Sequence, residues 1–174
     1  MSTQFFDLTV NEVIKETDNT VSLSFKIPED LIDTFKYHHG QYLTLKFDIN
    51  GESHRRAYSM SSAPDDEDIT VTVKRVADGM VSTHINDNIR SGSVISVMPP
   101  QGRFFSPLKE ENRKNYYLFG AGSGITPLMS IIKAILEQEP QSTVFLLYGN
   151  RNEESIIFKD KLSDLEKKYS GQFI

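Results

Sequence analysis

The sequence predicts a protein in two parts: a six-stranded antiparallel β-barrel with a capping helix, followed by an incomplete parallel α/β domain. Apolar and polar residues alternate through much of the stretch up to about residue 105, as in half-buried strands. Asn50-Gly51 is the strongest short hairpin signal in the chain. Beyond Gln101-Gly102, short apolar stretches alternate with apolar stripes at helical spacing. We therefore expect a barrel over residues 1–108 and the start of an α/β domain over residues 109–174.

Six strands are expected in the first part, over residues 6–14, 21–25, 42–49, 52–60, 69–76 and 93–98. In the second of these, Val21, Leu23 and Phe25 alternate with serines, which predicts a strand with one buried face. Six strands with few helices favour closure into a barrel, because closure removes exposed edges. Val81, Ile85 and Ile89 lie four residues apart and predict one short helix over residues 82–90.

The second part has the pattern strand, helix, strand, helix. Strands are expected over residues 115–119 and 143–148, each followed by a helix with an apolar stripe. Thr126 is the expected N-cap of the first helix and Asn152 that of the second. Residues 171–174 resemble the start of a third strand. Two parallel strands with two helices cannot bury both faces of a sheet, so we expect this domain to be incomplete.

Composition excludes several classes of function. The chain has 174 residues, no cysteine and a net charge of −5. Without cysteine it can hold no disulfide, thiolate zinc site or cysteine-bound iron–sulfur cluster, and the four histidines show no metal spacing. The acidic balance argues against a nucleic-acid partner. No apolar run approaches a membrane span and no secretory signal begins the chain, so we expect a cytoplasmic protein without a membrane partner. The acidic run at residues 65–68 is interpreted as a solvated turn.

A glycine-rich turn at residues 120–127 follows a strand and opens a helix. In this context backbone N–H groups can approach a pyrophosphate. The spacing is G-x-G-x-G, and Ile125 stands where the common dinucleotide-binding pattern has its last glycine. A tight turn without any ligand is the alternative interpretation.

A second motif, Arg56-Ala57-Tyr58-Ser59, lies about sixty residues earlier, on the strand after the hairpin. Alternation places Arg56 and Tyr58 on one face, where a guanidinium can hold a phosphate and a phenol ring can stack on a flat ring. A simple Arg–Tyr pair on the barrel exterior is the alternative. Lys74-Arg75 and the helix start at residues 79–82 add further cations and a second helix N-terminus, which a diphosphate needs.

Taken in order, these motifs resemble the ferredoxin–NADP reductase family over nearly the whole chain. The matching segments are residues 39–42, 56–59, 73–75, 79–82, 102–104, 120–127 and 148–151. Within that family the chain is most similar to reductase subunits of multicomponent oxygenases, of the phenylacetyl-CoA oxygenase reductase type. His39 departs from the pattern, because the family usually has proline there.

The resemblance implies FAD and NAD(P)H as cofactors and gives roles to particular residues. Tyr58 would pack on the isoalloxazine, Ser59 would hydrogen-bond near flavin N5, and Thr126 would lie between flavin and nicotinamide; these three are the candidate catalytic residues. Arg56 and the residue 79–82 amides, with the Ser82 hydroxyl, would hold phosphate. Arg151 would meet the adenosine-side phosphates of NAD(P)H, or else is a surface arginine. The complete cofactor-binding set is Arg56, Ala57, Tyr58, Ser59, Val73, Lys74, Arg75, Gly79, Met80, Val81, Ser82, Gly120, Gly122, Gly124, Thr126 and Arg151.

The function implied is that of the flavin module of an NAD(P)H-dependent electron-transfer reductase. Hydride would pass from NAD(P)H to FAD, and single electrons would then pass to an iron–sulfur domain or oxygenase component. A [2Fe–2S] cluster is expected only in a C-terminal domain absent from this chain. Two alternatives stay open: a catalytically silent flavin-binding or electron-transfer partner subunit, and a barrel with an unrelated small-molecule role.

Overall fold

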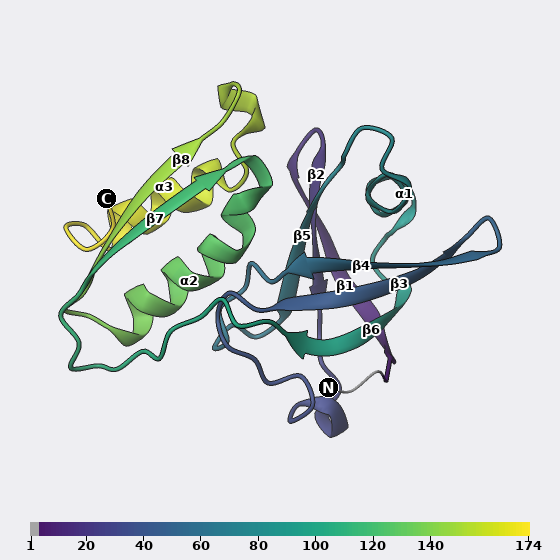
Figure 1. Ribbon diagram of the computed structural model, residues 1–174, viewed down its shortest axis with the longest axis horizontal. Coiled ribbons are helices and arrows are strands. Elements are labelled where there is room, and N and C mark those ends of the chain that lie inside the picture. Colours follow the sequence, from purple (N-terminus) through teal and green to yellow (C-terminus); the bar gives the residue numbers. More distant parts are fainter. Residues whose placement is uncertain (1–3) are drawn as a thin grey trace.

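A computed structural model describes residues 4–174 and shows two parts lying side by side (Figure 1). The first part holds six strands: β1 (Phe6–Thr17), β2 (Thr20–Phe25), β3 (Tyr42–Ile49), β4 (Glu52–Ser59), β5 (Ile69–Lys74) and β6 (Val94–Gln101). It also holds a short 3₁₀ turn, η1 (Glu29–Leu31), and one helix, α1 (Met80–Asn88). The paired strands of this sheet all run antiparallel.

The predicted barrel is confirmed. The strand order is β4-β3-β6-β1-β2-β5, and a bridge between Met60 and Val71 joins the two ends of the sheet. Asn50 and Gly51 both have positive φ, 54° and 82°, as a two-residue hairpin between β3 and β4 requires. α1 closes the barrel by burying Val81 and Ile85 in its core, and it begins two residues earlier than predicted, after Gly79.

β2 differs from the prediction, because all six of its residues are buried. The serines expected to face solvent are engaged in hydrogen bonds instead. The Ser22 hydroxyl donates to Glu16 Oε1 at 2.7 Å and lies 2.7 Å from Thr72 Oγ1. Lys161, from the second part, also donates to Glu16. The α/β part therefore reaches this face of the barrel, and the bond that joins the two here is the Lys161–Glu16 ion pair.

The second part contains β7 (Asn115–Ala121), η2 (Gly122–Gly124), α2 (Ile125–Gln138), β8 (Thr143–Gly149), η3 (Glu153–Ser155) and α3 (Lys159–Lys168). β7 and β8 pair in parallel. The amide of Ile174 donates to the Val144 carbonyl at 2.9 Å, which confirms the predicted start of a third strand beside β8.

Only one face of this small sheet is covered by helices within residues 4–174. Leu118 and Val144 pack into the core formed with α2 and α3. On the other face four large apolar side chains are exposed, Phe119 by 71%. The other three are Tyr117, Leu147 and Ile174. The expectation that two helices leave one face of the sheet uncovered is confirmed.

Two predicted N-caps are wrong. α2 continues directly from the 3₁₀ turn and begins at Ile125, so Thr126 lies inside the helix and its hydroxyl donates to the Ser123 carbonyl at 3.0 Å. Asn152 caps η3, where its side chain accepts from the Ser155 amide at 3.1 Å. α3 begins later than predicted, at Lys159.

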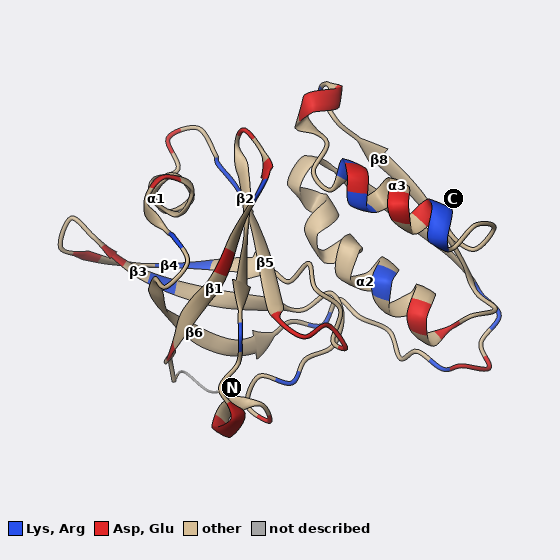
Figure 2. Ribbon diagram, turned by 180° about the vertical axis from the view of Figure 1, so that it is seen from behind, with Lys and Arg blue, Asp and Glu red and all other residues tan. Residues whose placement is uncertain are grey.

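The acidic run is also more than a solvated turn. Asp66 forms an ion pair with Lys133 of α2, and Asp65 accepts from Gln138 at 2.8 Å. Asp68 accepts from Ser24 of β2. Figure 2 shows this acidic loop before β5, on the side of the barrel that faces α2. The run joins the two parts of the protein.

No helix among residues 4–174 is long and apolar enough to cross a bilayer.

Candidate functional site

A cleft of about 780 Å³ separates the barrel from the α/β part. The barrel side is formed by residues 74–77, at the end of β5. The opposite side is formed by residues 121–123 of the glycine turn and by Gly149, Asn150, Arg151 and Ser155 after β8. The structure therefore brings together four of the predicted site residues, Lys74, Arg75, Gly122 and Arg151, from three distant segments of the chain.

The glycine turn occupies the carboxyl end of β7, where open parallel sheets bind ligands. A Cβ atom on Gly120 would lie 2.8 Å from Leu128 Cδ1, so the turn packs closely on α2. Gly122 has a φ of +51°, a conformation that side chains disfavour. The first-turn amides of a helix have no intrahelical acceptor, so the turn can offer N–H groups to an anion.

Thr126 lies beneath this turn rather than at the cleft surface. It is 3% exposed, and it is not one of the described residues that line the cleft. Its hydroxyl is engaged with the Ser123 carbonyl. In this structure Thr126 supports the turn from inside, and its role between two cofactors stays a prediction.

The cleft carries unneutralised positive charge. Among residues 4–174, neither Lys74 nor Arg151 has a hydrogen bond or ion pair through its side chain. The described residues that line the cleft include no carboxylate. Arg75 differs, since its guanidinium makes two bonds to the Asp87 carboxylate at 2.5 and 3.1 Å. Two free cations beside exposed amides suit an anionic ligand such as a dinucleotide diphosphate.

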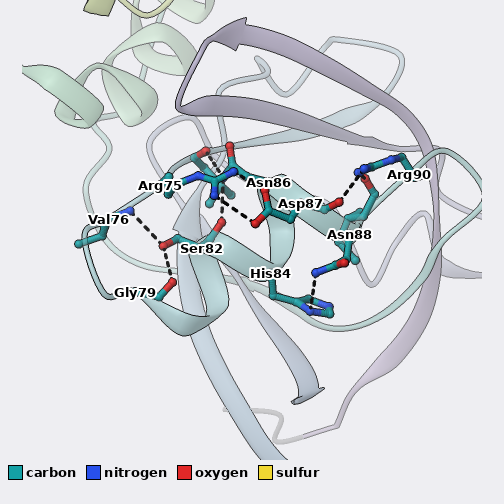
Figure 3. Close-up of polar contacts among 11 residues, drawn as sticks. Arg75, Val76, Gly79, Ser82, His84, Asn86, Asp87, Asn88 and Arg90 are labelled. Atoms are coloured by element: carbon teal, nitrogen blue, oxygen red, sulfur yellow. Dashed lines mark hydrogen bonds and ion pairs between the residues drawn. The ribbon is translucent and has the colours of Figure 1, made fainter. Parts of the chain in front are cut away.

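The start of α1 forms a tight loop beside the cleft (Figure 3). The Ser82 hydroxyl accepts from the Val76 amide and donates to the Gly79 carbonyl, both at 3.1 Å. A Cβ atom on Gly79 would lie 2.6 Å from that hydroxyl, so only glycine fits without rearrangement. Val81 is buried in the barrel core, which leaves its backbone amide as the group that a phosphate could reach. The side chain of Met80 is exposed.

The second motif lies on β4, and its alternation is as predicted. Arg56 is opposite Leu45 and Tyr58 is opposite Leu43, so both side chains share the face that those leucines present to the barrel core. Arg56 is exposed, with one bond to the Arg55 carbonyl at 2.8 Å. Burial raises the pKa of Tyr58 to about 12, which keeps its phenol neutral. Ala57 lies on the other face, and Ser59 is half-buried at the end of the strand.

Sequence reasoning missed two residues that hold the site together. Asp87 pairs with Arg75, and Tyr148 donates its hydroxyl to the Gly122 carbonyl at 2.8 Å. Local sequence patterns could reveal neither pair, because Arg75 and Asp87 lie 12 positions apart and Gly122 and Tyr148 lie 26 positions apart. An aspartate in the last turn of a predicted helix, where a negative charge is unfavourable, was the one available signal for Asp87.

Comparison with known families agrees with this geometry. A model of the oxidoreductase FAD-binding domain matches residues 7–105. The chain belongs to this FAD-binding family. A second model, of the oxidoreductase NAD-binding domain, matches residues 118–174, which include the glycine turn. The resemblance found from the motifs is therefore confirmed for both parts of the chain.

Curated relatives refine the comparison. The chain is 40% identical over 167 residues to a subunit of the 1,2-phenylacetyl-CoA epoxidase of Escherichia coli (strain K12), covering 96% of this chain and 47% of the relative. It is 45% identical over 165 residues to the ferredoxin reductase component of 3-ketosteroid-9-alpha-monooxygenase of Rhodococcus rhodochrous, covering 93% and 46%. The chain thus spans about half the length of these relatives.

Solved structures share the fold. The flavohem-like FAD/NAD-binding domain of nitric oxide dioxygenase from Vibrio cholerae O1 biovar El Tor superposes with a TM-score of 0.82 at 25% identity, covering 94% of this chain and 70% of that one. Ferredoxin-NADP+ reductase from Plasmodium falciparum gives 0.84 at 21% identity, covering 98% and 71%. At that identity the second likeness concerns the fold alone.

Proposed function

We propose that the chain is the flavin module of an NAD(P)H-dependent electron-transfer reductase that serves an oxygenase system. The observation that carries the proposal is the cleft, in which the end of β5 in the FAD-binding part faces the glycine turn of the NAD-binding part. Two relatives, one named as part of an epoxidase and one as a monooxygenase reductase component, support the oxygenase assignment. A cytoplasmic location stays a prediction of the sequence.

The residues present fit such a cofactor pair. When bound, the flavin supplies hydride acceptance from NAD(P)H and one-electron release to an iron–sulfur acceptor. The chain's own task is to bind and orient. Arg56 and the amides at the start of α1 would hold the diphosphate of FAD, and the neutral Tyr58 ring would pack on its flat head. Lys74 and Arg75 would border the flavin at the end of β5, and Arg151 and the glycine turn would hold the pyridine nucleotide on the other side of the cleft. Hydride transfer itself requires no side chain to act as acid or base.

We also propose that residues 109–174 form the first part of a larger nucleotide-binding domain. A parallel sheet is normally covered on both faces, and within the described residues β7 and β8 are covered on one. The iron–sulfur acceptor would lie in a further domain or in a separate oxygenase component, because this chain has no cysteine.

FAD titration of the chain tests the first half of the proposal. The single variants Arg56→Ala and Tyr58→Ala should each weaken FAD binding, the former by about tenfold to a hundredfold, since charge-assisted bonds to phosphate contribute about 1.5–3 kcal/mol. Arg55→Ala is the matched control, because Arg55 is an exposed arginine on the opposite face of β4. A chain that stays colourless after incubation with excess FAD and desalting would refute the proposal.

The uncovered face of the β7–β8 sheet favours one second candidate, a flavin-binding partner subunit that does not itself oxidise NAD(P)H. Steady-state assays with NADH or NADPH and ferricyanide separate the two. Turnover by the FAD-loaded protein that carries the whole nucleotide-binding domain supports the reductase, whereas tight FAD binding with no turnover in that protein supports the partner subunit.

A further inference from the structure

Two loops form the α/β side of the cleft, and one side chain links them. The glycine turn follows β7, and residues 149–155 follow β8. Both lie at the carboxyl end of the parallel sheet, so the position of one relative to the other fixes the shape of any nucleotide site there. Tyr148, the penultimate residue of β8, donates its hydroxyl to the Gly122 carbonyl at 2.8 Å.

Tyr148 is built into the sheet and is not one of the described residues that line the cleft. It lies opposite Gly120 in the parallel ladder, and its ring packs against the core formed with α2 and α3. Burial raises the pKa of Tyr148, so the phenol keeps its proton and stays a donor. A ring fixed by packing holds its hydroxyl at a fixed point, and the bond fixes Gly122 in turn.

The bond falls on the one glycine of the turn that has a positive φ. Gly122 has φ +51° and, as glycine, has wide conformational freedom. Its carbonyl also accepts from the amide of Ile125, at the start of α2. Loss of the tyrosine bond would therefore loosen the turn without removing the helix start.

We infer that Tyr148 is a positioning residue for the pyridine nucleotide, holding the glycine turn in register with the loop after β8 so that the turn's amides face the ligand. The inference rests on the proposed function, in which this turn binds NAD(P)H. It predicts that Tyr148 affects nucleotide affinity and leaves FAD affinity unchanged. The hydrogen bond and the packing of Tyr148 both lie within the α/β part, away from the barrel residues proposed to hold FAD.

The test compares Tyr148→Phe with Tyr117→Phe in the FAD-loaded chain. Both changes remove one tyrosine hydroxyl, but Tyr117 is exposed on the opposite face of the sheet. Calorimetric titration with NAD⁺ and NADP⁺ should show Y148F binding the preferred nucleotide about threefold to tenfold more weakly, as expected for one lost hydrogen bond. Hydrogen–deuterium exchange should increase at residues 120–124. FAD affinity, and protection in the interior of α2, should match the wild type, and Y117F should match it throughout.

Each other outcome overturns the inference in a distinguishable way. Equal nucleotide affinity and equal exchange in Y148F and the wild type would show that the bond positions nothing. Loss of protection throughout α2 would show that the hydroxyl stabilises the fold as a whole. Wild-type protein that carries the whole nucleotide-binding domain and binds FAD but neither nucleotide would refute the NAD(P)H half of the proposed function, and this inference with it.

Discussion

Glu139, directly after α2, is a buried carboxylate with no cation beside it among residues 4–174. It is 0% exposed. Its Oε1 accepts from the Lys109 amide at 3.1 Å and from the Asn112 side chain. Its Oε2 accepts from Tyr116 at 2.8 Å and from Ser142 at 2.7 Å. These bonds fasten the segment between the two parts to the end of α2, to β7 and to the residue before β8.

Replacing this carboxylate by an amide, Glu139→Gln, keeps the shape and removes the charge. Burial raises the pKa of Glu139, but the four hydrogen-bond donors together lower it by more, so the pKa lies below its usual value. The bonds therefore outweigh desolvation, and losing the charge must destabilise the fold. Charge-assisted bonds contribute about 1.5–3 kcal/mol and neutral ones about 1 kcal/mol. Weakening of two to four of these bonds is partly offset because a neutral amide costs less to bury than a carboxylate. The free energy of unfolding should therefore fall by about 2–3 kcal/mol.

Urea unfolding of the chain at pH 7 measures this loss. Glu137→Gln is the matched control, because Glu137 is exposed on the same helix, and it should change stability by less than about 0.5 kcal/mol. Because folding lowers the pKa of Glu139, its carboxylate stabilises the fold at pH values above the unfolded pKa, near 4.5. This stabilisation is lost as pH falls through the lower folded pKa. The gap between wild type and E139Q should therefore shrink below pH 4.5. Equal stability at pH 7, or a gap that stays constant down to about pH 3, would refute this reasoning.

Three further predictions concern the cleft, the uncovered sheet face and the contact between the parts. Arg151→Gln should weaken binding of the pyridine nucleotide and reduce its salt dependence in titrations at two ionic strengths, while Arg113→Gln, an exposed arginine outside the cleft, should not. The uncovered apolar face predicts that the chain self-associates; Phe119→Lys should reduce this self-association in analytical ultracentrifugation, and Val94→Lys, at a similarly exposed site on the barrel, should not. Lys161→Gln should lower the free energy of unfolding, measured in urea, by about 1–3 kcal/mol, because it leaves the buried side chain of Glu16 without its cation.

Local patterns account for the parts of the fold that were predicted correctly. The Asn50-Gly51 turn fixes the β3–β4 register, and that register alone places Arg56 and Tyr58 on one face. The same logic failed where a residue's partner is distant in sequence. Ser22 meets Thr72, 50 positions away, and Lys133 meets Asp66, 67 positions away. A serine that alternates with apolar residues looks solvent-facing until another part of the chain covers it.

The helix starts were missed for a different reason. Thr126 has the side chain of a good N-cap, but η2 runs into α2 and moves the cap position to Gly124. A glycine-rich turn is common to many structures, and its sequence does not reveal whether a 3₁₀ segment precedes the helix. Tyr148 could not be predicted as a positioning residue at all, since its pattern is that of an ordinary core residue of a buried strand.

The two parts have separate apolar cores and are joined by polar contacts, and this division bears on how the site works. Within the described chain the barrel core and the α/β core share no residue, while the contacts between them include Lys133–Asp66, Gln138–Asp65 and Lys161–Glu16. Polar interfaces between domains permit relative motion more readily than large apolar ones. FAD affinity should therefore depend on the barrel alone. Nucleotide affinity should depend also on these contacts, because the cleft has one side in each part. A change at the interface that weakened both affinities equally would argue that the cores are coupled, and that the barrel cannot hold its ligand independently.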